Sequence, residues 1–329
     1  MNIAVLGAGA WGTALAIYLS ARHRVTLWTR NTKHLTELAA QRVNQRYLPE
    51  QRLPDAIHFA FKLNDALEQA ELVFVVVPVA GLRATVQQIA ALNRTLPLVL
   101  CCKGFEADTG KLPCQVVEDV CARDITCSVL SGPSFAREVA MGLPAALTLA
   151  SRDDAFARRV ANEIHTANLR VYSGNDVIGV EVGGALKNVI AIAAGISDGL
   201  AFGNNARAAL ITRGLAEITR LGVALGGHRE TFTGLSGIGD LILTCTGDLS
   251  RNRQVGTMLA AGRQLGDILP EIGHVAEGVY TVQEAYRLGQ QLQVDMPVTQ
   301  AVHNIIYAQL SVKEAISNML DREPGMEVG

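Results

Sequence analysis

Along the first half of the chain, short continuous runs of hydrophobic residues alternate with segments in which hydrophobic residues recur about every 3.6 positions. Short apolar runs are typical of buried strands, and segments with a 3.6-residue period between several of them are typical of helices. The predicted strands cover residues 3–6, 25–28, 57–59, 72–76, 98–101, 126–130, 146–149 and 169–172. Helical segments such as 81–92 and 153–165 separate them. This alternation predicts a mostly parallel sheet with helices on both faces.

The pattern changes after about residue 176, where strand signals fade. Helical periods then dominate, over residues 180–200, 206–225, 251–261, 279–291 and 299–308. Because no Pro- or Gly-rich linker marks the change, we predict two rigidly joined domains, an α/β domain over residues 1–178 and an all-α domain over residues 179–329. We expect the substrate to bind in the cleft between these two domains. Residues 322–329 lack an apolar period, and we expect them to be disordered.

The first predicted strand runs into a glycine turn and then into an apolar helix over residues 13–19. Gly7 allows the tight turn, Gly9 lets the backbone approach a pyrophosphate, and Gly12 lets the helix pack close to the strand. The helix N-terminus then faces the anion. Such a turn can also exist without a ligand. Its setting at the start of an alternating sheet favours a Rossmann-type domain that binds a dinucleotide.

The second predicted strand ends in Thr29, Arg30 and Asn31. NAD-selective sites usually carry an acid near this point, which holds the ribose 2′-hydroxyl. No acid is present here, and the guanidinium of Arg30 suits a 2′-phosphate. The alternative is that Arg30 is a solvated cation at a strand end. We predict that NADP(H) is preferred and that NAD(H) is accepted.

Composition limits the remaining classes of function. The 329 residues carry a formal net charge of −2, which gives no bulk attraction for nucleic acid or anionic membranes. The apolar run 72–77 is too short to span a bilayer, and the first strand pattern begins at residue 2, so we expect a cytoplasmic protein without an integral membrane segment. The six cysteines form no C-x-x-C pair, and no cluster has metal-ligand spacing. We therefore expect reduced thiols and no metal site.

Lys187 lies in the middle of an apolar helical segment, where an ammonium group is costly unless it is paired or functional. Burial would bring its pKa nearer to neutrality and make it a usable acid or base. Its stem could instead lie along the core while the ammonium group reaches water. Lys103 follows a buried strand, at the sheet edge where ligands collect. Asp240 precedes an apolar helix start, where it could cap that helix or orient a catalytic lysine.

Ser250 precedes another helical segment. As an N-cap it leaves free N–H groups at Arg251 and Asn252, and Arg251 adds a planar cation. These residues could therefore bind a phosphate group. The alternative interpretation is an ordinary capped helix whose arginines at 251 and 253 face solvent. Glu277 begins a later helix, where an acid in the first turn also suits the helix dipole.

Seven blocks of the chain, taken in order, resemble the bacterial-type NAD(P)-dependent glycerol-3-phosphate dehydrogenases. They are residues 7–14, 44–49, 103–104, 131–136, 186–188, 237–241 and 249–253. The likeness covers nearly the whole chain. It implies reversible hydride transfer between NAD(P)H and dihydroxyacetone phosphate, giving sn-glycerol 3-phosphate for glycerophospholipid synthesis.

The resemblance also implies roles for individual residues. Lys187 matches the family's proton donor and acceptor at the substrate oxygen. Substrate contacts are implied for Lys103, Gly132, Ser134, Lys187, Asp240, Ser250, Arg251 and Asn252. Cofactor contacts are implied for Trp11, Arg30, Asn31, Lys103, Ala136, Arg251, Val275 and Glu277, besides the three glycines. We expect Lys103 to lower the pKa of Lys187 and to stabilise the alkoxide, while Asp240 and Thr244 hold Lys187 or a substrate hydroxyl.

Two other interpretations are open. A reductase of the same architecture that acts on a β-hydroxyacid or a ketoacid would bind a carboxylate where we expect a phosphate. A non-catalytic NAD(P)-binding module would keep the glycines but would need neither Lys187 nor the block 250–252. We also expect a homodimer through the helical domain, because two-fold dimers are the commonest oligomers.

Replacing Arg30 with Ala should lower the preference for NADPH over NADH, because a 2′-phosphate would lose its bidentate partner. We expect the ratio of the two kcat/KM values to fall by about 10- to 100-fold, the range for a lost charged hydrogen bond. Oxidation of each cofactor, followed by absorbance, measures this ratio. A preference for the 2′-phosphate that survives in Arg30→Ala would show that another group holds it.

Overall fold

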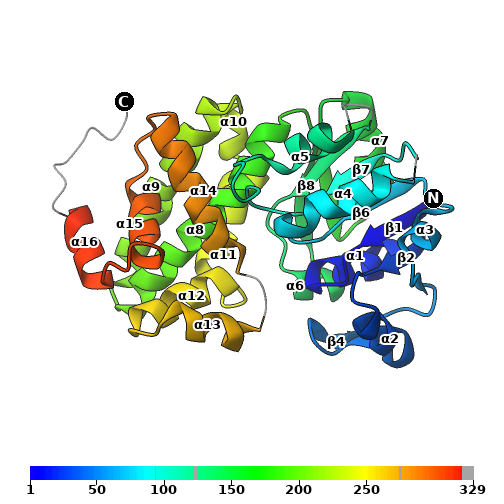
Figure 1. Cartoon of the computed structure of the whole chain (residues 1–329), viewed down its shortest axis with the longest axis horizontal. Coiled ribbons are helices and arrows are strands. Elements are labelled where there is room, and N and C mark those ends of the chain that lie inside the picture. The colour runs from blue at the N-terminus through cyan, green and yellow to red at the C-terminus, as the bar shows by residue number, and fades with distance from the viewer. Residues whose placement is uncertain (93, 122–124, 274–275, 321–329) are drawn as a thin grey trace.

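The computed structural model describes residues 1–92, 94–121, 125–273 and 276–320. Figure 1 shows two halves side by side, one built around a sheet at the N-terminal end of the chain and one built of helices. The change between them falls between strand β10, which ends at Gly174, and helix α8, which begins at Val177. The division at residues 178 and 179 stays a prediction. The disorder predicted for residues 322–329 concerns residues outside the described ranges.

The first half contains an eight-stranded sheet with the order β10, β9, β8, β7, β6, β1, β2, β5. Its strands are β1 (Asn2–Leu6), β2 (Arg24–Trp28), β5 (His58–Phe59), β6 (Leu72–Val75), β7 (Leu98–Leu100), β8 (Cys127–Ser131), β9 (Ala145–Ser151) and β10 (Leu169–Gly174). Neighbouring strands are parallel except β8 and β9. All eight predicted strands are present, and the prediction of a mostly parallel sheet is confirmed.

Helices cover both faces of this sheet. They are α1 (Ala10–Ser20), α2 (Thr32–Gln41), α3 (Leu63–Leu67), α4 (Leu82–Ala90), α5 (Pro113–Cys121), α6 (Ala136–Ala140) and α7 (Asp154–Ile164). Alternate residues of β1 belong to two separate apolar clusters. Ile3 and Val5 pack with α1 and α7, whereas Ala4 and Leu6 pack with α4 and α5. A strand that is buried on both faces needs an uninterrupted apolar run, which is why its pattern was readable in the sequence.

A short hairpin was not predicted. Strands β3 (Val43–Asn44) and β4 (Leu48–Arg52) form a separate antiparallel pair. Its sequence lacks the apolar alternation of a half-buried strand, since β4 is mostly exposed. Asn44 is nevertheless buried, and its amide Nδ2 donates to the Ala8 carbonyl at 3.0 Å and to Thr13 Oγ1 at 2.7 Å. The hairpin is therefore tied to the glycine turn after β1.

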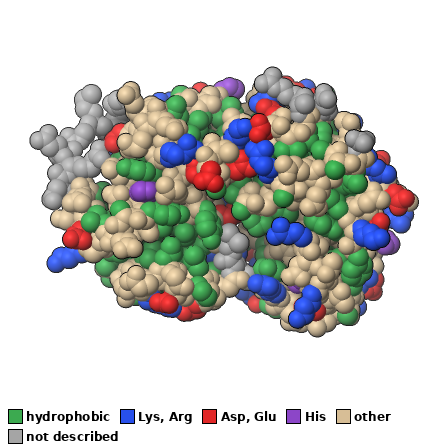
Figure 2. Space-filling model, in the orientation of Figure 1, with side chains coloured by type: hydrophobic (Ala, Val, Ile, Leu, Met, Phe, Trp, Pro, Cys, Tyr) green, Lys and Arg blue, Asp and Glu red, His purple; other side chains and the backbone are tan. Residues whose placement is uncertain are grey.

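The surface carries charges of both signs. Figure 2 shows basic and acidic side chains mixed over one face of the molecule, and apolar side chains gathered on the helical half. Exposed large apolar residues of that half include Phe202, Val223 and Tyr307.

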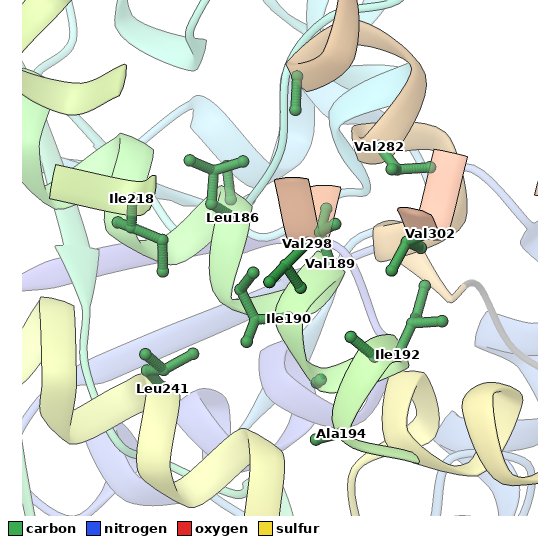
Figure 3. Packing of buried hydrophobic residues seen from close by; sticks show 14 of the residues in the cluster. Leu186, Val189, Ile190, Ile192, Ala194, Ile218, Leu241, Val282, Val298 and Val302 are labelled. Atoms are coloured by element: carbon green, nitrogen blue, oxygen red, sulfur yellow. The ribbon is translucent and has the colours of Figure 1, made fainter. Parts of the chain in front are cut away.

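The second half is built around the long helix α8 (Val177–Gly199). Around it lie α9 (Gly203–Ala224), α10 (Arg229–Phe232), α11 (Asp240–Thr246), α12 (Arg251–Ala260), α13 (Leu265–Ile272), α14 (Glu277–Gln291), α15 (Pro297–Ile306) and α16 (Val312–Leu320). All five helices predicted in this half are present. In length and composition α8 could cross a membrane, but 94% of its most apolar window is buried inside the protein. It is a core helix, and Figure 3 shows its Leu186, Ile190 and Ile192 among side chains of the surrounding helices.

Helices α8 and α12 cross at two glycines. A Cβ on Gly256 would lie 2.0 Å from the Ile192 carbonyl oxygen, and one on Gly195 would lie 1.9 Å from the Arg253 carbonyl oxygen. The two backbones are therefore in direct contact, which only residues without a side chain permit. This crossing sets where the N-terminus of α12 lies relative to the middle of α8.

Replacing Gly256 with Ala should lower the free energy of unfolding by about 3 kcal/mol, the upper range for overpacking a core. Gly266 offers a matched control, because it lies in helix α13 with no atom within 4 Å of a Cβ placed there. Gly266→Ala should leave stability unchanged or raise it by up to about 1 kcal/mol. Urea denaturation measures both values, and equal effects would show that the crossing tolerates a methyl group.

Candidate active site

A cleft of about 1040 Å³ opens between the two halves. It is lined by the ends of β1, β6, β7 and β8 on one side and by α8, α12 and α14 on the other. The carboxyl ends of parallel strands are where ligands bind in open α/β sheets. The structure therefore places a large site where the sequence led us to expect the substrate.

The glycine turn forms one end of this cleft. Gly7 has φ +122°, and a Cβ there would lie 2.5 Å from the Val76 carbonyl oxygen, while one on Gly12 would lie 1.8 Å from the Gly7 carbonyl oxygen. A Cβ on Gly9 would meet no atom within 4 Å. Packing thus requires Gly7 and Gly12, whereas Gly9 borders open space. Helix α1 begins there without a side-chain cap or an acid in its first turn, so its N–H groups can bind a pyrophosphate.

The other residues that we expected to contact the cofactor differ in whether they line the cleft and in what else they contact. Those that line the cleft are Trp11, Arg30, Asn31, Ala136 and Glu277, whereas Val275 lies outside the described residues. Arg30 is exposed, and within the described ranges it forms no ion pair. Asn31 also has a structural task, since its side chain accepts a hydrogen bond from the His34 N–H at 3.0 Å and caps α2.

Two side chains that the sequence analysis did not identify hold the glycine turn after β1 in place. Besides Asn44, His34 contacts the Ala8 carbonyl oxygen through Nε2, at 3.2 Å. Asn44 opens one of the blocks that carried the family resemblance, but nothing in its local pattern indicated a contact with the glycine turn.

Two lysines share one buried carboxylate at the bottom of the cleft. Asp240 is the first residue of α11 and follows a π-helical turn, Leu235–Gly239. Its Oδ1 accepts from Lys187 Nζ, and its Oδ2 accepts from Lys103 Nζ at 2.7 Å. Asp240 is 1% exposed and Lys187 is 8% exposed. The structure thus brings together three residues that lie 84 and 53 positions apart in the chain (187 − 103 and 240 − 187).

The three groups have unequal pKa shifts. Burial and, to a smaller extent, the cation of Lys103 together lower the pKa of Lys187 to about 8, against the opposing effect of Asp240. For Lys103, the effect of burial is outweighed by Asp240, which raises the pKa of that ammonium. The two cations likewise outweigh burial at Asp240 and lower its pKa. Lys187 is therefore the member that can gain and lose a proton near neutral pH, while Lys103 stays charged.

The expected role of Thr244, to hold Lys187 or a substrate hydroxyl, stays a prediction. Its hydroxyl donates to the backbone carbonyl of Asp240 at 2.6 Å, one turn earlier in α11. It therefore supports the start of the helix that carries Asp240, although it also lines the cleft.

The two arginines at the start of α12 differ in their partners. Ser250 caps the helix, and its Oγ accepts from the Arg253 N–H at 3.3 Å. Arg253 is held by Asp198 and Asp248, at 2.7 Å and 2.9 Å. Arg251 lines the cleft and, within the described residues, forms no ion pair. Of the two arginines in this block, Arg251 is thus the one available to a ligand.

Asn252 has a task that the sequence did not indicate. Its Nδ2 donates to Asn188 Oδ1 at 2.9 Å, and its Oδ1 accepts from the Gly278 N–H at 3.0 Å. Its side chain therefore joins α12 to α8 and α14, beside the cleft that it also lines.

Gly132 and Ser134 lie after β8. Gly132 has φ +139°, and Ser134 Oγ donates to its carbonyl oxygen at 3.0 Å. Ser134 lines the cleft, whereas Gly132 and Asp240 are not among the residues that line it. In the described part of the chain, no group of three or more His, Cys, Asp or Glu side chains could hold a metal ion.

Comparisons with known proteins assign the chain to a family. Residues 2–157 match the model for the N-terminus of NAD-dependent glycerol-3-phosphate dehydrogenase, and residues 176–317 match the model for its C-terminus. The glycerol-3-phosphate dehydrogenase (NAD(P)+) of Nitrosomonas eutropha is 82% identical over 327 residues, 99% of each chain. That of Nitrosospira multiformis is 58% identical and covers 100% of both chains.

Solved structures place the fold in the same family. The crystal structure of glycerol-3-phosphate dehydrogenase from Coxiella burnetii has a TM-score of 0.94 and 40% identity, over 98% of this chain and 99% of that one. D-mandelate dehydrogenase in complex with NADH has a TM-score of 0.61 at 14% identity, over 94% and 98% of the chains, which is a likeness of fold alone.

Proposed function

Because the chain belongs to the NAD-dependent glycerol-3-phosphate dehydrogenase family, we propose that Lys187 is the acid and base of its reaction. The activity is the NAD(P)-dependent interconversion of sn-glycerol 3-phosphate and dihydroxyacetone phosphate. The observation that carries the role of Lys187 is the ion triad at the bottom of the cleft. There a buried lysine has its pKa lowered to about 8, beside a second lysine that stays charged.

In the direction of reduction, the Lys187 ammonium donates a proton to the substrate oxygen as that oxygen gains negative charge. The nicotinamide cofactor, when bound, supplies the hydride. Lys103 keeps its positive charge and stabilises the developing alkoxide. Asp240 holds both ammonium groups in place and keeps the buried cations paired. In the direction of oxidation, neutral Lys187 accepts the proton.

The phosphate group of the substrate binds at the start of α12 in this proposal. A helix N-terminus attracts anions, and Arg251 adds a guanidinium that no carboxylate in the described residues engages. Ser134 contacts the substrate from the opposite side of the cleft, after β8. A carboxylate substrate would also be attracted here, but the family membership favours the phosphate.

The adenosine end of the cofactor binds between the glycine turn and the end of β2. Arg30 borders the cleft there, and Asn31 has its side chain engaged in capping α2. We propose that Arg30 binds a 2′-phosphate, so that NADP(H) is preferred and NAD(H) is accepted. Trp11, Ala136 and Glu277 line the same cleft and complete the cofactor site.

The wider role is also a proposal. We place the enzyme in the cytoplasm, where its product feeds glycerophospholipid synthesis. The half over residues 1–178 binds the cofactor, and the half over residues 179–329 binds most of the substrate. A homodimer through the helical half is supported by the apolar side chains exposed there, such as Phe202 and Val223.

Replacing Lys187 with Ala tests the acid-base role. Turnover should fall by about 10²- to 10⁴-fold, the usual contribution of a positioned acid or base, while the Kd of NADPH changes little. In the wild-type enzyme, reduction should slow as the pH rises through about 8, because the protonated amine is lost, and oxidation should speed up over the same range. Steady-state rates against pH measure this. Substantial turnover in Lys187→Ala would refute the role.

Replacing Arg251 with Ala should raise the KM for dihydroxyacetone phosphate by about 10- to 100-fold, because the phosphate loses a charge-assisted hydrogen bond. Arg253→Ala is the matched control on the same helix turn. It removes an arginine that Asp198 already engages, so we expect a lower Tm and little change in KM. An unchanged KM in Arg251→Ala would move the phosphate site elsewhere.

A further inference from the structure

The segment that follows Lys103 is held between the two halves of the molecule. We call residues 104–111 the clamp loop. On the sheet side, Arg83 of α4 donates from Nε and Nη2 to the two carboxylate oxygens of Glu106, both at 2.8 Å. On the helical side, Glu284 of α14 accepts from the Asp108 N–H through Oε1, at 3.0 Å. Charged side chains of both signs gather over this junction in Figure 2.

The clamp loop is closed on itself. The Glu106 N–H donates to the Lys111 carbonyl at 2.9 Å, and the Gly110 N–H donates to the Glu106 carbonyl at 2.9 Å. Its backbone takes left-handed conformations at Asp108 (φ +65°) and Gly110 (φ +66°). A turn with this many internal bonds moves as a unit, so a displacement at Asp108 would be passed on to Lys103 at its start.

Glu284 is oriented for this contact. It is 6% exposed, and its Oε2 accepts from Arg287 Nε and Nη2 at 2.9 Å and 2.7 Å. Arg287 therefore fixes the carboxylate and neutralises it, which leaves Oε1 for Asp108. The loop also meets α14 one turn earlier, because a Cβ on Gly104 would lie 2.9 Å from Thr281 Oγ1. The clamp loop is thus seated on α14 at two successive turns.

We propose that Glu284 is a positioning residue for the reaction, which holds the clamp loop so that Lys103 stays beside Asp240 and Lys187. This inference rests on the role proposed above for Lys187. Gly104, with φ +121°, is the residue between Lys103 and the rest of the loop. Without the bond from Asp108 to Glu284, the loop can turn at this glycine and withdraw the Lys103 ammonium from the triad.

The position of Lys103 affects the acid directly. The titratable groups that interact with Lys187 are Asp240 and Cys245 of α11, Lys103 at the strand end and Glu277 of α14, while Arg251 of α12 acts on Glu277. Lys103 is the nearest like charge, and its repulsion lowers the pKa of Lys187. If Lys103 withdraws, that repulsion is lost and Asp240 is left to Lys187 alone. Both changes raise the pKa of Lys187, so its protonated form persists to higher pH.

A purely structural role for Glu284 would give a different result. Glu217 provides the matched control, because it is also a buried carboxylate of the helical half, 1% exposed. It accepts from the Val298 and Thr299 N–H groups at 2.6 Å and 3.0 Å, at the start of α15. Its removal should lower the Tm without moving any charge of the triad.

The test compares Glu284→Ala, Glu284→Gln and Glu217→Ala in full-length enzyme. Three quantities are measured: kcat for reduction of dihydroxyacetone phosphate by NADPH against pH, the Tm, and the rate at which formaldehyde and cyanoborohydride methylate Lys103, followed by mass spectrometry. In Glu284→Ala, kcat should fall by about 10- to 100-fold, as for a small misplacement of a catalytic group. The pH at which reduction declines should rise by about one unit, and Lys103 should react faster.

Two further variants distinguish a positioning role of Glu284 from a purely structural one. Glu284→Gln keeps one acceptor oxygen, but when that oxygen accepts from Asp108 the amide NH2 meets the Arg287 donors, so the profile should lie between those of the wild type and Glu284→Ala. Glu217→Ala should lower the Tm and leave both the pH profile and the Lys103 reactivity unchanged. If Glu284→Ala does not fold, Gly110→Ala takes its place. A Cβ there would lie 2.6 Å from Arg287 Nη2 and would loosen the same contact from the loop side.

A folded Glu284→Ala enzyme with an unmoved pH profile and unmoved Lys103 reactivity would overturn the proposal, and so would an equal shift in Glu217→Ala. The methylation readout separates the two proposals. If the wild-type enzyme shows no decline in reduction near pH 8, the role of Lys187 fails. In that case, the rate of Lys103 methylation alone tests whether Glu284 holds the clamp loop, because methylation does not depend on catalysis.

Discussion

The site depends on one carboxylate that two buried ammonium groups share. Burying a lysine among apolar side chains is costly, and burying two is possible here because Asp240 pairs with both. Pairing with the same carboxylate leaves the two lysines with different pKa shifts. Lys187 lies deeper and has its pKa lowered, whereas Lys103 keeps its charge. One carboxylate thus holds one lysine whose pKa is lowered and one that keeps its charge, which are the two properties that the proposed reduction of a ketone requires.

Close backbone contacts let three helices reach this point. The glycines at which α8 and α12 cross bring the start of α12 against the middle of α8. A third contact closes the arrangement, since a Cβ on Gly278 of α14 would lie 2.6 Å from the Asn188 carbonyl oxygen. The amide of Asn252 then bonds to both neighbouring helices. Residues without side chains therefore determine how far Lys187 on α8 lies from the start of α12.

The sequence predicted the parts whose signal is local. All eight strands of the sheet were readable. Central strands such as β1 and β6 are covered on both faces and are therefore apolar throughout, whereas the edge strand β10 begins with alternating buried and exposed residues. Lys187 was conspicuous because a charge interrupts an apolar helix. The hairpin β3–β4 was missed because its strands are short and largely polar. The bond from Thr244 to the Asp240 carbonyl was also missed, although a Thr hydroxyl inside a helix readily bonds to the carbonyl four residues earlier.

The contacts that sequence could not give are those between distant residues. Nothing near Glu284 in the sequence indicates that it meets Asp108, 176 positions earlier, because a helical Glu–Arg pair at i and i+3 is an ordinary surface pattern. What distinguishes it is burial, which turns such a pair into a rigid acceptor. The same reasoning applies to Asp198, which pairs with Arg253, whereas Arg251 forms no ion pair within the described residues. In both cases an acid holds an arginine through an ion pair, and only the folded structure shows which neighbouring groups that pair leaves available for other contacts.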